Sequence, residues 1–431
     1  MPKLSFYNTI NNKSKRNEAI DHSKLILNIL ILLAILREAP FTRLIGIQII
    51  YFCIFFVASF GIIYLIFIKQ RINKRLLFFF IILLTFNIFS AMSAAYNPNI
   101  YVNYSWHLQA FSWIGLFYLS YAALKNNYDF FSVRKFLPII YIFVFMHLAL
   151  LYFSFSGARN IFSFEWFLSG SYSFISQSEE FGFDKVGIVM ILHAFTILTW
   201  PRLGKYEKIF LGCLAIFYPF LIGSRTSILG LLALGTFIYI GSFKYFIVRV
   251  ISFWSLTLVL LFGAYKYYDV IEQVTISSGR YLLPVFTSID FYKKPFGFGP
   301  GNYTYIAEND LLNINLTTTP VLLIFRSNEG IYDGNPYGLF PASESNWLWF
   351  GISFGWIFLL FIGTTFFFLL YKVVIKKSIQ CPEVTVSTYL LIYLFFSGLA
   401  QDHIYNHSSW IIISFCISRV ILYKNKSYVN S

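Results

Sequence analysis

The sequence predicts an all-α polytopic integral membrane protein with about 12 transmembrane helices and one long outer loop. Two observations predict this fold class. Of the 431 residues, 58% are hydrophobic and only 12% are charged, whereas soluble domains carry about a quarter charged residues. The apolar residues also fall into runs near the ~20 residues that a helix needs to cross a bilayer. We therefore expect residues 1–431 to form a single integral membrane domain.

Twelve apolar runs are each expected to form a helix. The first is short, so it is expected to tilt or to lie partly at the membrane interface. The basic segment 69–75 divides the second run from the third, and the turn Gly-Ser-Arg-Thr-Ser at 223–227 divides the seventh from the eighth. In chain order the expected helices cover residues 25–36, 44–68, 76–95, 106–124, 137–157, 186–200, 209–223, 227–243, 246–268, 346–371, 386–400 and 410–422.

The charged residues divide unevenly between the two sides of these helices. With residues 1–24 placed as a cytoplasmic tail, the cytoplasmic side holds 23 of the 33 Lys and Arg residues and only five acids. The opposite side holds ten bases and fourteen acids. This is the positive-inside bias, so both termini are expected in the cytoplasm. The net charge of +14 therefore reports orientation, and nucleic acid is not expected as a partner.

Two loops on the outer side are longer than the others. Residues 158–185 form the first, and residues 269–345 form the second. A structureless loop of the second loop's length is uncommon and is usually functional. Apolar stretches at 281–286 and 321–325 suggest short helices that pack on the membrane surface.

Two arginines on the outer side stand out, because the positive-inside bias disfavours them there. Arg225 lies in a five-residue turn between two apolar helices, and Arg280 lies in the long loop. A guanidinium group presents a planar fork of donors that matches phosphate oxygens. Together the two arginines favour an anionic lipid headgroup as ligand. Either one alone has the alternative of snorkelling or of pairing with a loop acid.

Acid–base candidates are few. Glu344 lies just before a helix, where it either offsets the helix dipole or acts as a general base; spacing leaves both open. His403 and His407 lie in the last outer loop, and a polar surface loop is favoured there over a metal site, because no helix is expected to hold the pair. His147 and His193 fall in mid-span and are expected to face the bundle interior.

Several motifs are absent from the sequence. There is no G-x-x-x-x-G-K-[ST], which excludes a P-loop nucleotide motor. The glycine run at 296–303, Phe-Gly-Phe-Gly-Pro-Gly-Asn-Tyr, has no strand before it and lacks the dinucleotide-binding spacing. No Asp-x-Asp pair offers a metal to a nucleotide sugar. No cofactor and no metal are expected.

Three segments, taken together, resemble the bacterial O-antigen polymerase (Wzy) family within the O-antigen polymerase and ligase superfamily. Residues 223–230 look like its Ser-Arg turn between two helices. Arg280 followed by the glycines of 295–302 looks like the arginine-then-glycine pattern of its large periplasmic loop. Residues 344–348, followed by Gly355, look like the start of the helix after that loop. The resemblance in order, spacing and topology covers most of the chain, although each motif alone has low specificity.

The resemblance implies a GT-C-like helical fold and a glycosyltransferase that uses neither a metal nor a nucleotide sugar. Wzy polymerases take oligosaccharide repeat units on undecaprenyl pyrophosphate at the periplasmic face of the inner membrane. They transfer the growing glycan from its lipid to the sugar of an incoming unit. The partners implied are this lipid-linked oligosaccharide, membrane lipid and a chain-length regulator protein.

The resemblance also suggests roles for individual residues. Arg225 and Arg280, with Arg326 as a weaker third, match the arginines that would stabilise charge growing on the pyrophosphate leaving group. The glycines of the run are expected to form a turn that passes close to the glycan or headgroup, where a Cβ would clash. Near that turn, the residues expected to contact substrate are Gly299, Gly301, Asn302 and Tyr303.

One departure separates two branches of the superfamily. The ligase branch carries a histidine at the start of the helix after the large loop, whereas this chain has Glu344, Ser345 and Asn346 there. The polymerase branch is therefore favoured, with Glu344 as the expected base and His403 as the alternative. The rival functions are an O-antigen ligase, a flippase for lipid-linked sugars, against which the long loop counts, and a scaffold. The sugars and the linkage do not follow from the sequence.

Overall fold

The computed structural model describes most of the chain, and within the part that it describes no β-strand occurs. The described residues are 23–37, 47–67, 74–96, 104–154, 185–222, 224–267, 289–300, 346–379, 381–398 and 407–423.

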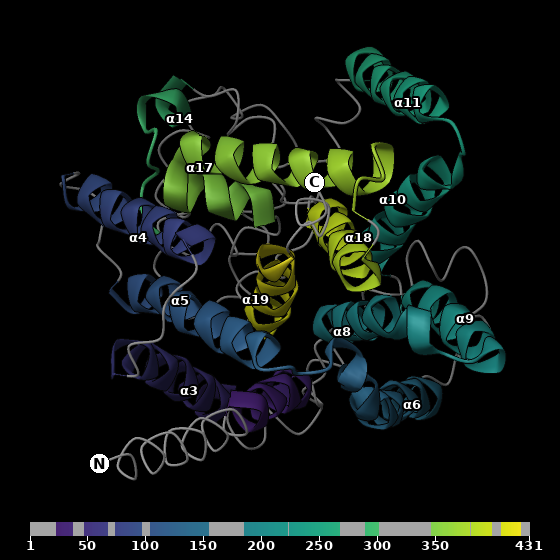
Figure 1. The fold of residues 1–431 in the computed structure, drawn as a ribbon, viewed down its shortest axis with the longest axis horizontal. Helices are drawn as coiled ribbons and strands as arrows, with labels where there is room; N and C mark the ends of the chain where they lie inside the picture. Colours follow the sequence, from purple (N-terminus) through teal and green to yellow (C-terminus); the bar gives the residue numbers. More distant parts are fainter. Residues whose placement is uncertain are drawn as a thin grey trace, which may run out of the picture.

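The described part of each of the twelve expected segments is mostly helical (Figure 1). The first described helix covers residues 23–37. The elements after it are α3 (Ile47–Phe67), α4 (Lys74–Ala95), α5 (Tyr104–Lys125), the 3₁₀ helix η1 (Phe130–Phe136), α6 (Leu137–Ser154), α8 (Lys185–Thr199), η4 (Trp200–Arg202), α9 (Lys205–Leu221), α10 (Arg225–Ser242), α11 (Phe246–Lys266), α14 (Ile289–Lys293), α17 (Asn346–Leu370), the π-helical turn η7 (Tyr371–Ile375), α18 (Pro382–Ser397) and α19 (His407–Leu422).

Four described helices are long and apolar enough to cross a membrane. They are Lys74–Ala95, Phe130–Ala149, Phe246–Gly263 and Phe350–Ile375. Five shorter apolar helices accompany them, at Phe52–Gly61, Gly187–Arg202, Ser227–Ser242, Pro382–Ser397 and Ser409–Leu422. By the length and composition of these helices, the chain is a helical membrane protein.

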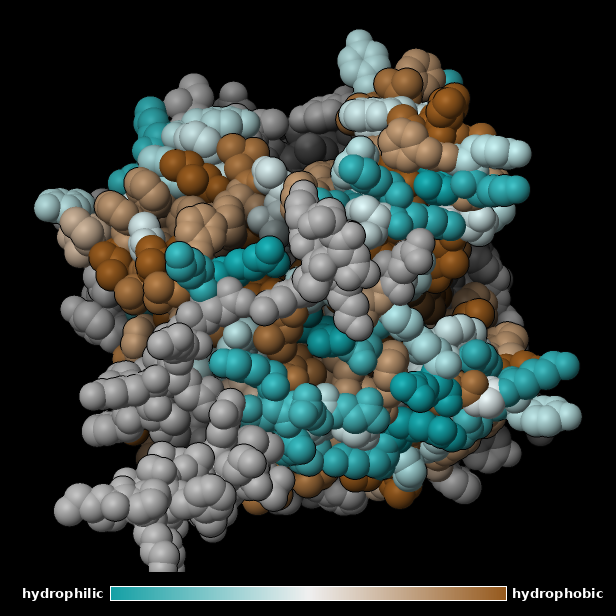
Figure 2. Space-filling view, viewed as in Figure 1, coloured by the Kyte–Doolittle hydropathy of each residue, from teal (hydrophilic) through white to brown (hydrophobic). Residues whose placement is uncertain are grey.

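The exposed surface of α11 is apolar enough to face lipid. Only 6% of its membrane-length stretch is buried, and consecutive side chains from Leu258 to Leu261 are 59–67% exposed. Figure 2 shows hydrophobic side chains gathered over α11 and over α4. A contiguous apolar surface of this kind is rare on a water-soluble monomer, whereas the hydrocarbon of a bilayer solvates it. The helical backbone meanwhile satisfies its own hydrogen-bonding groups.

α5 forms the centre of the helix packing, in contact with α3, α4 and α19. A Cβ on Gly61 of α3 would lie 2.7 Å from the Leu119 side chain and 3.1 Å from the Gly115 carbonyl oxygen of α5. Small residues permit such close approach between membrane helices. On its other side, α5 stacks Trp113 on Trp410 of α19, with ring centroids 3.7 Å apart.

Charged contacts join ends of helices that the sequence places on one side. Arg134 of η1 lies 2.5 Å from Glu207 of α9, and Arg419 of α19 forms an ion pair with Glu383 of α18. The sequence predicts all four residues on the cytoplasmic side. Figure 2 shows hydrophilic side chains gathered where η1, α8 and α9 meet. These contacts agree with the predicted grouping of helix ends.

α17 is not one continuous helix. Gly355 has φ 83° and ψ 173°, which breaks the helix after its first nine residues. Trp347, before the break, and Phe366, after it, both pack on the ring of Phe395, with centroid distances of 4.2 and 4.0 Å. In an unbroken helix these two residues would be roughly 28 Å apart along the axis. The chain therefore folds back at Gly355, and Figure 1 shows the two stretches of α17 lying against each other.

Candidate functional site

The glycine run of the long loop docks against the break in α17. Gly297 has φ 78°, and a Cβ on it would lie 2.5 Å from the Ile352 carbonyl oxygen and 2.6 Å from the Gly355 nitrogen. A Cβ on Gly355 would overlap the Pro295 carbonyl group. Two glycines with positive φ thus face each other, backbone to backbone, where no side chain fits.

Hydrogen bonds close the break. Because α17 stops and restarts, backbone groups on both sides of Gly355 lose their helical partners. The Phe298 N–H donates to the Ile352 carbonyl oxygen at 2.7 Å, and the Ile357 N–H donates to the Pro295 carbonyl oxygen at 3.4 Å. The Ser90 hydroxyl of α4 donates to the Ser353 carbonyl oxygen. Irregular backbone at membrane depth is tolerated when protein satisfies its polar groups in this way.

α4 holds the docked segment from its other side. The Ser93 hydroxyl donates to the Gly297 carbonyl oxygen at 2.5 Å. The Phe296 ring stacks on Phe89, with centroids 4.6 Å apart. The segment 289–300 is therefore fixed between α4 and α17, and it is part of the membrane domain.

The predicted turn lies in contact with protein at Gly297, which passes close to α17. The predicted approach of the glycines to a glycan or headgroup stays a prediction. Gly299 also has positive φ, 91°, and is buried. Gly301, Asn302 and Tyr303 lie outside the described residues, so their predicted substrate contacts remain predictions.

The Ser-Arg turn forms the second part of the site. The Ser224 N–H donates to the Pro219 carbonyl oxygen of α9 at 2.8 Å, and α10 then begins at Arg225. The Ser224 and Ser227 hydroxyls lie 2.8 Å apart, both buried. The backbone of Arg225 is therefore held between two buried serines, at the end of α10 where the N–H groups are unpaired within the helix.

A buried polar cluster lies beneath this turn. His193 of α8 is fully buried, and its Nδ1 lies 2.8 Å from the Tyr393 hydroxyl of α18. Its Nε2 lies 2.7 Å from the Ala215 carbonyl oxygen of α9. The Tyr393 hydroxyl also interacts with the hydroxyl of Ser227. The cluster therefore ties α8, α9 and α18 to the first turn of α10.

The last turns of α18 are the meeting point of these parts. A Cβ on Gly230 of α10 would lie 2.9 Å from the Tyr393 ring and 3.1 Å from Ser397. The Trp347 indole N–H at the start of α17 donates to the Phe395 carbonyl oxygen at 3.0 Å. The N-terminal ends of α10 and α17 thus both pack on residues 393–397. The positive ends of helix dipoles favour anions.

Of the predicted catalytic and binding arginines and acid–base residues, only Arg225 lies within the described residues. Arg225 is placed as the first residue of α10. The others, Arg280, Arg326, Glu344 and His403, lie outside the described residues. Asn346 begins α17, two residues after Glu344. Within the described part of the chain, no group of three or more His, Cys, Asp or Glu side chains is placed to hold a metal ion.

Tyr393 is a candidate that the sequence did not single out, whereas Ser227 belongs to the Ser-Arg segment that it did. The mid-span position of His193 did predict that it faces the interior, as His147 also does. A tyrosine among many apolar aromatics gives no signal of its own, since its partner lies 200 residues away in the chain.

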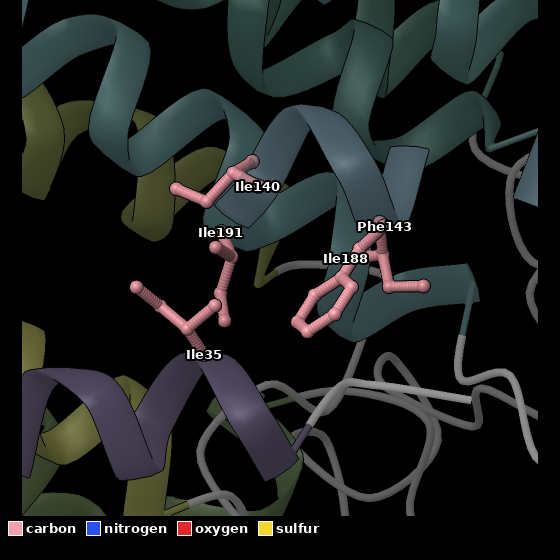
Figure 3. A pocket seen from close by; sticks show the side chains of 5 residues that line it. All are labelled: Ile35, Ile140, Phe143, Ile188 and Ile191. Atoms are coloured by element: carbon pink, nitrogen blue, oxygen red, sulfur yellow. The ribbon is translucent and has the colours of Figure 1, made fainter. Parts of the chain in front are cut away.

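A small cavity lies elsewhere. It measures about 10 Å³ and is lined by Ile35, Ile140, Phe143, Ile188 and Ile191 (Figure 3). That volume is at the lower limit for one water molecule, and no polar side chain lines it. This cavity is a packing defect between the first helix, α6 and α8, and it offers no chemistry.

Comparison of the chain with models of protein families, with curated proteins and with solved structures finds no match.

Proposed function

We propose that this chain is a surface-polysaccharide polymerase of the O-antigen (Wzy) type. In the proposed reaction, a hydroxyl of the incoming lipid-linked repeat unit attacks the anomeric carbon of the growing glycan. The glycosidic bond to undecaprenyl pyrophosphate breaks, and its electron pair leaves with the pyrophosphate. The hydroxyl proton passes to a base on the protein.

One observation supports this proposal above the others. The described parts of the three sequence segments that carry the resemblance are connected through α17 and α18. Residues 295–298 bond directly to the break in α17, and the start of α17 packs on the last turns of α18. The Ser-Arg segment packs on the same turns of α18 through Gly230.

The charges suit the chemistry. Arg225 and Arg280 are proposed to bind the pyrophosphate and to stabilise the negative charge that grows as the bond breaks, with Arg326 as a further contact. The N-terminus of α10 adds its helix dipole at Arg225. Glu344, just before α17, is proposed to accept the hydroxyl proton, with His403 as the alternative base. Asn302 and Tyr303 are proposed to bind sugar.

The proposal places the protein in the bacterial inner membrane with both termini in the cytoplasm, as the charge bias predicts. It also assigns a GT-C-like fold with about twelve spans and no cofactor. A chain-length regulator is the expected protein partner.

Deletion of the gene in its own host tests the proposal. Surface polysaccharide is resolved on a gel after complementation with wild type, Arg225→Ala, Arg280→Ala and Glu344→Ala. Lipid A core that bears a single repeat in the deletion strain, and a ladder restored by wild type alone, would support polymerase activity. Core with no repeat at all in the deletion strain would indicate a ligase or flippase instead.

A further inference from the structure

We infer that a cluster of basic residues, where α10 and η7 end and α11 begins, binds the phosphate group of an anionic phospholipid. The members of this basic cluster are Lys244, Arg249, Lys372, Lys376 and Lys377. The sequence predicts all of them on the cytoplasmic side of the membrane. Their role therefore does not depend on the reaction proposed for the outer side.

The buried side chain of Arg249 holds the basic cluster together. It is only 5% exposed. Its Nε donates to the Ile375 carbonyl oxygen at 2.6 Å, and one terminal nitrogen donates to the Phe243 and Lys244 carbonyl oxygens at 2.7 and 3.0 Å. The connection between α10 and α11 and the last residue of η7 thus lie against one guanidinium group. Because Lys376 directly follows Ile375, its backbone is brought close to that of Lys244.

The turn after η7 brings the other lysines to the same place. The Ser378 N–H donates to the Lys372 carbonyl oxygen at 3.0 Å, which closes a turn that contains Lys376 and Lys377. Lys377 has φ 50°, a left-handed conformation that residues other than glycine adopt uncommonly. The Lys372 Nζ lies 4.2 Å from the centroid of the Phe368 ring, and Lys376 and Lys377 are both exposed. The turn therefore presents its charges at the end of α17.

Protein groups neutralise only a small part of this charge. Within the described part of the chain, none of the four lysines forms an ion pair, and Glu383, the acid nearest in sequence, is paired with Arg419. Two helix ends with negative dipole charge meet one with positive dipole charge here, which together amount to roughly half a negative charge. The basic cluster carries five positive charges. Most of its charge is therefore available to an anion.

The position of the basic cluster favours a lipid headgroup over a soluble anion. The membrane-length stretch of α11 begins at Phe246, and that of α17 and η7 ends at Ile375. Tyr245, Ile247 and Ile251 beside the cluster are 67, 69 and 58% exposed. Figure 2 shows hydrophilic side chains gathered where α10, α11 and the end of α17 meet, next to the hydrophobic surface of α11. Basic residues at the end of a membrane helix, beside an apolar surface, suit an anionic phospholipid.

Lipid binding to the full-length protein, purified in detergent, tests the inference. The probes are phosphatidylglycerol and phosphatidylcholine with the same acyl chains, and affinity is read from the rise in unfolding temperature with lipid concentration. We expect wild type to bind phosphatidylglycerol about tenfold or more tightly than phosphatidylcholine. In the triple variant Lys244→Gln, Lys376→Gln, Lys377→Gln, the affinity for phosphatidylglycerol should fall about a hundredfold, which corresponds to about fivefold for each lysine.

The chain offers a matched control for the loss of charge. Lys135, Lys205 and Lys208 are also predicted on the cytoplasmic side, in a region that contains the ion pair of Arg134 with Glu207. Their triple substitution by Gln removes the same charge from another place. We expect this control variant to bind phosphatidylglycerol as wild type does. Inorganic phosphate is expected to raise the unfolding temperature of wild type much less than phosphatidylglycerol does, because it lacks the acyl chains that lie on an apolar surface.

Four results would overturn the inference. The first two are equal wild-type affinities for the two lipids and equal phosphatidylglycerol affinities of wild type and the triple variant. The third is an equal loss of affinity in the control variant. The fourth is a response to inorganic phosphate as large as that to phosphatidylglycerol, which would make the ligand a soluble anion. If the triple variant does not fold, the single Lys244→Gln and Lys376→Gln variants are compared with Lys205→Gln by the same criteria.

Discussion

The backbones of Gly297 and Gly355 lie directly against each other. Both residues have positive φ, and a Cβ on Gly355 would lie 2.5 Å from the Gly297 nitrogen. The contact joins the described end of the long loop, at 289–300, to the break in α17. The loop and the helix can pack in this way only if both residues are glycine, because a Cβ on either one would overlap the backbone of the other segment.

Gly355→Ala and Gly297→Ala are each expected to destabilise the protein by at least about 3 kcal/mol, from the positive φ and the backbone overlap combined. The unfolding midpoint in detergent measures this effect. Gly363→Ala, on the same helix, is the control, since no described atom lies within 4 Å of a Cβ there. Equal midpoints for Gly355→Ala and Gly363→Ala would contradict the docked arrangement.

Gly230→Ala is expected to separate α10 from α18, because the new Cβ would lie 2.9 Å from the Tyr393 ring. We expect a loss of about 1–3 kcal/mol and, if the proposed function holds, shorter or absent polysaccharide ladders. Gly235→Ala is the matched control on the same helix, with no atom within 4 Å of its Cβ. A Gly230→Ala protein as stable as Gly235→Ala would show that the two helices do not pack at this point.

Arg249 is expected to stabilise the end of η7 and the end of α10. It is only 5% exposed, its Nε donates to the Ile375 carbonyl oxygen at 2.6 Å, and one terminal nitrogen donates to the Phe243 and Lys244 carbonyl oxygens. Arg249→Met leaves these acceptors unpaired and should cost about 2–4 kcal/mol. Arg75→Met, which removes a longer 3.5 Å bond at an exposed site, should cost less than about 1 kcal/mol. Chemical-denaturation midpoints measure both effects. Equal midpoints for Arg249→Met and Arg75→Met would contradict the prediction.

Glu207 is expected to make stability depend on pH in the acid range. The Gly204 N–H and the Arg134 guanidinium hold the pKa of Glu207 below its ordinary value. A carboxyl group with a lowered folded-state pKa contributes stability above its unfolded-state pKa, and this contribution is lost as the pH falls through the folded-state pKa. Glu207→Gln should therefore flatten the decline of the unfolding temperature below about pH 4.5. If the unfolding temperature of Glu207→Gln declined with falling pH as steeply as that of wild type, the Glu207 carboxylate would not be the cause of the decline.

The positions of the helices followed from the sequence because hydrophobic runs bounded by charge determine where membrane helices form. The break in α17 did not follow. Gly355 sits within a long apolar run, and glycine is common inside membrane helices, so its positive φ depends on Gly297, 58 positions earlier. The Ser-Arg turn was recognised from its position, whereas the pairing of His193 with Tyr393 depends on how α8 and α18 pack.

The docking of segment 289–300 has a consequence for the variation of this protein. Phe298 is hydrogen-bonded to Ile352, and Asn346 is the first residue of the helix that contains Ile352. The described residues on either side of 301–345 are thus attached to one helix. The entropy of closing a loop between two fixed points rises by only about 0.6 kcal/mol for each doubling of its length. If the proposed function holds, we expect that residues 301–345 can be exchanged for a stretch of different length and composition, so that recognition of a new carbohydrate arises while the helices stay the same.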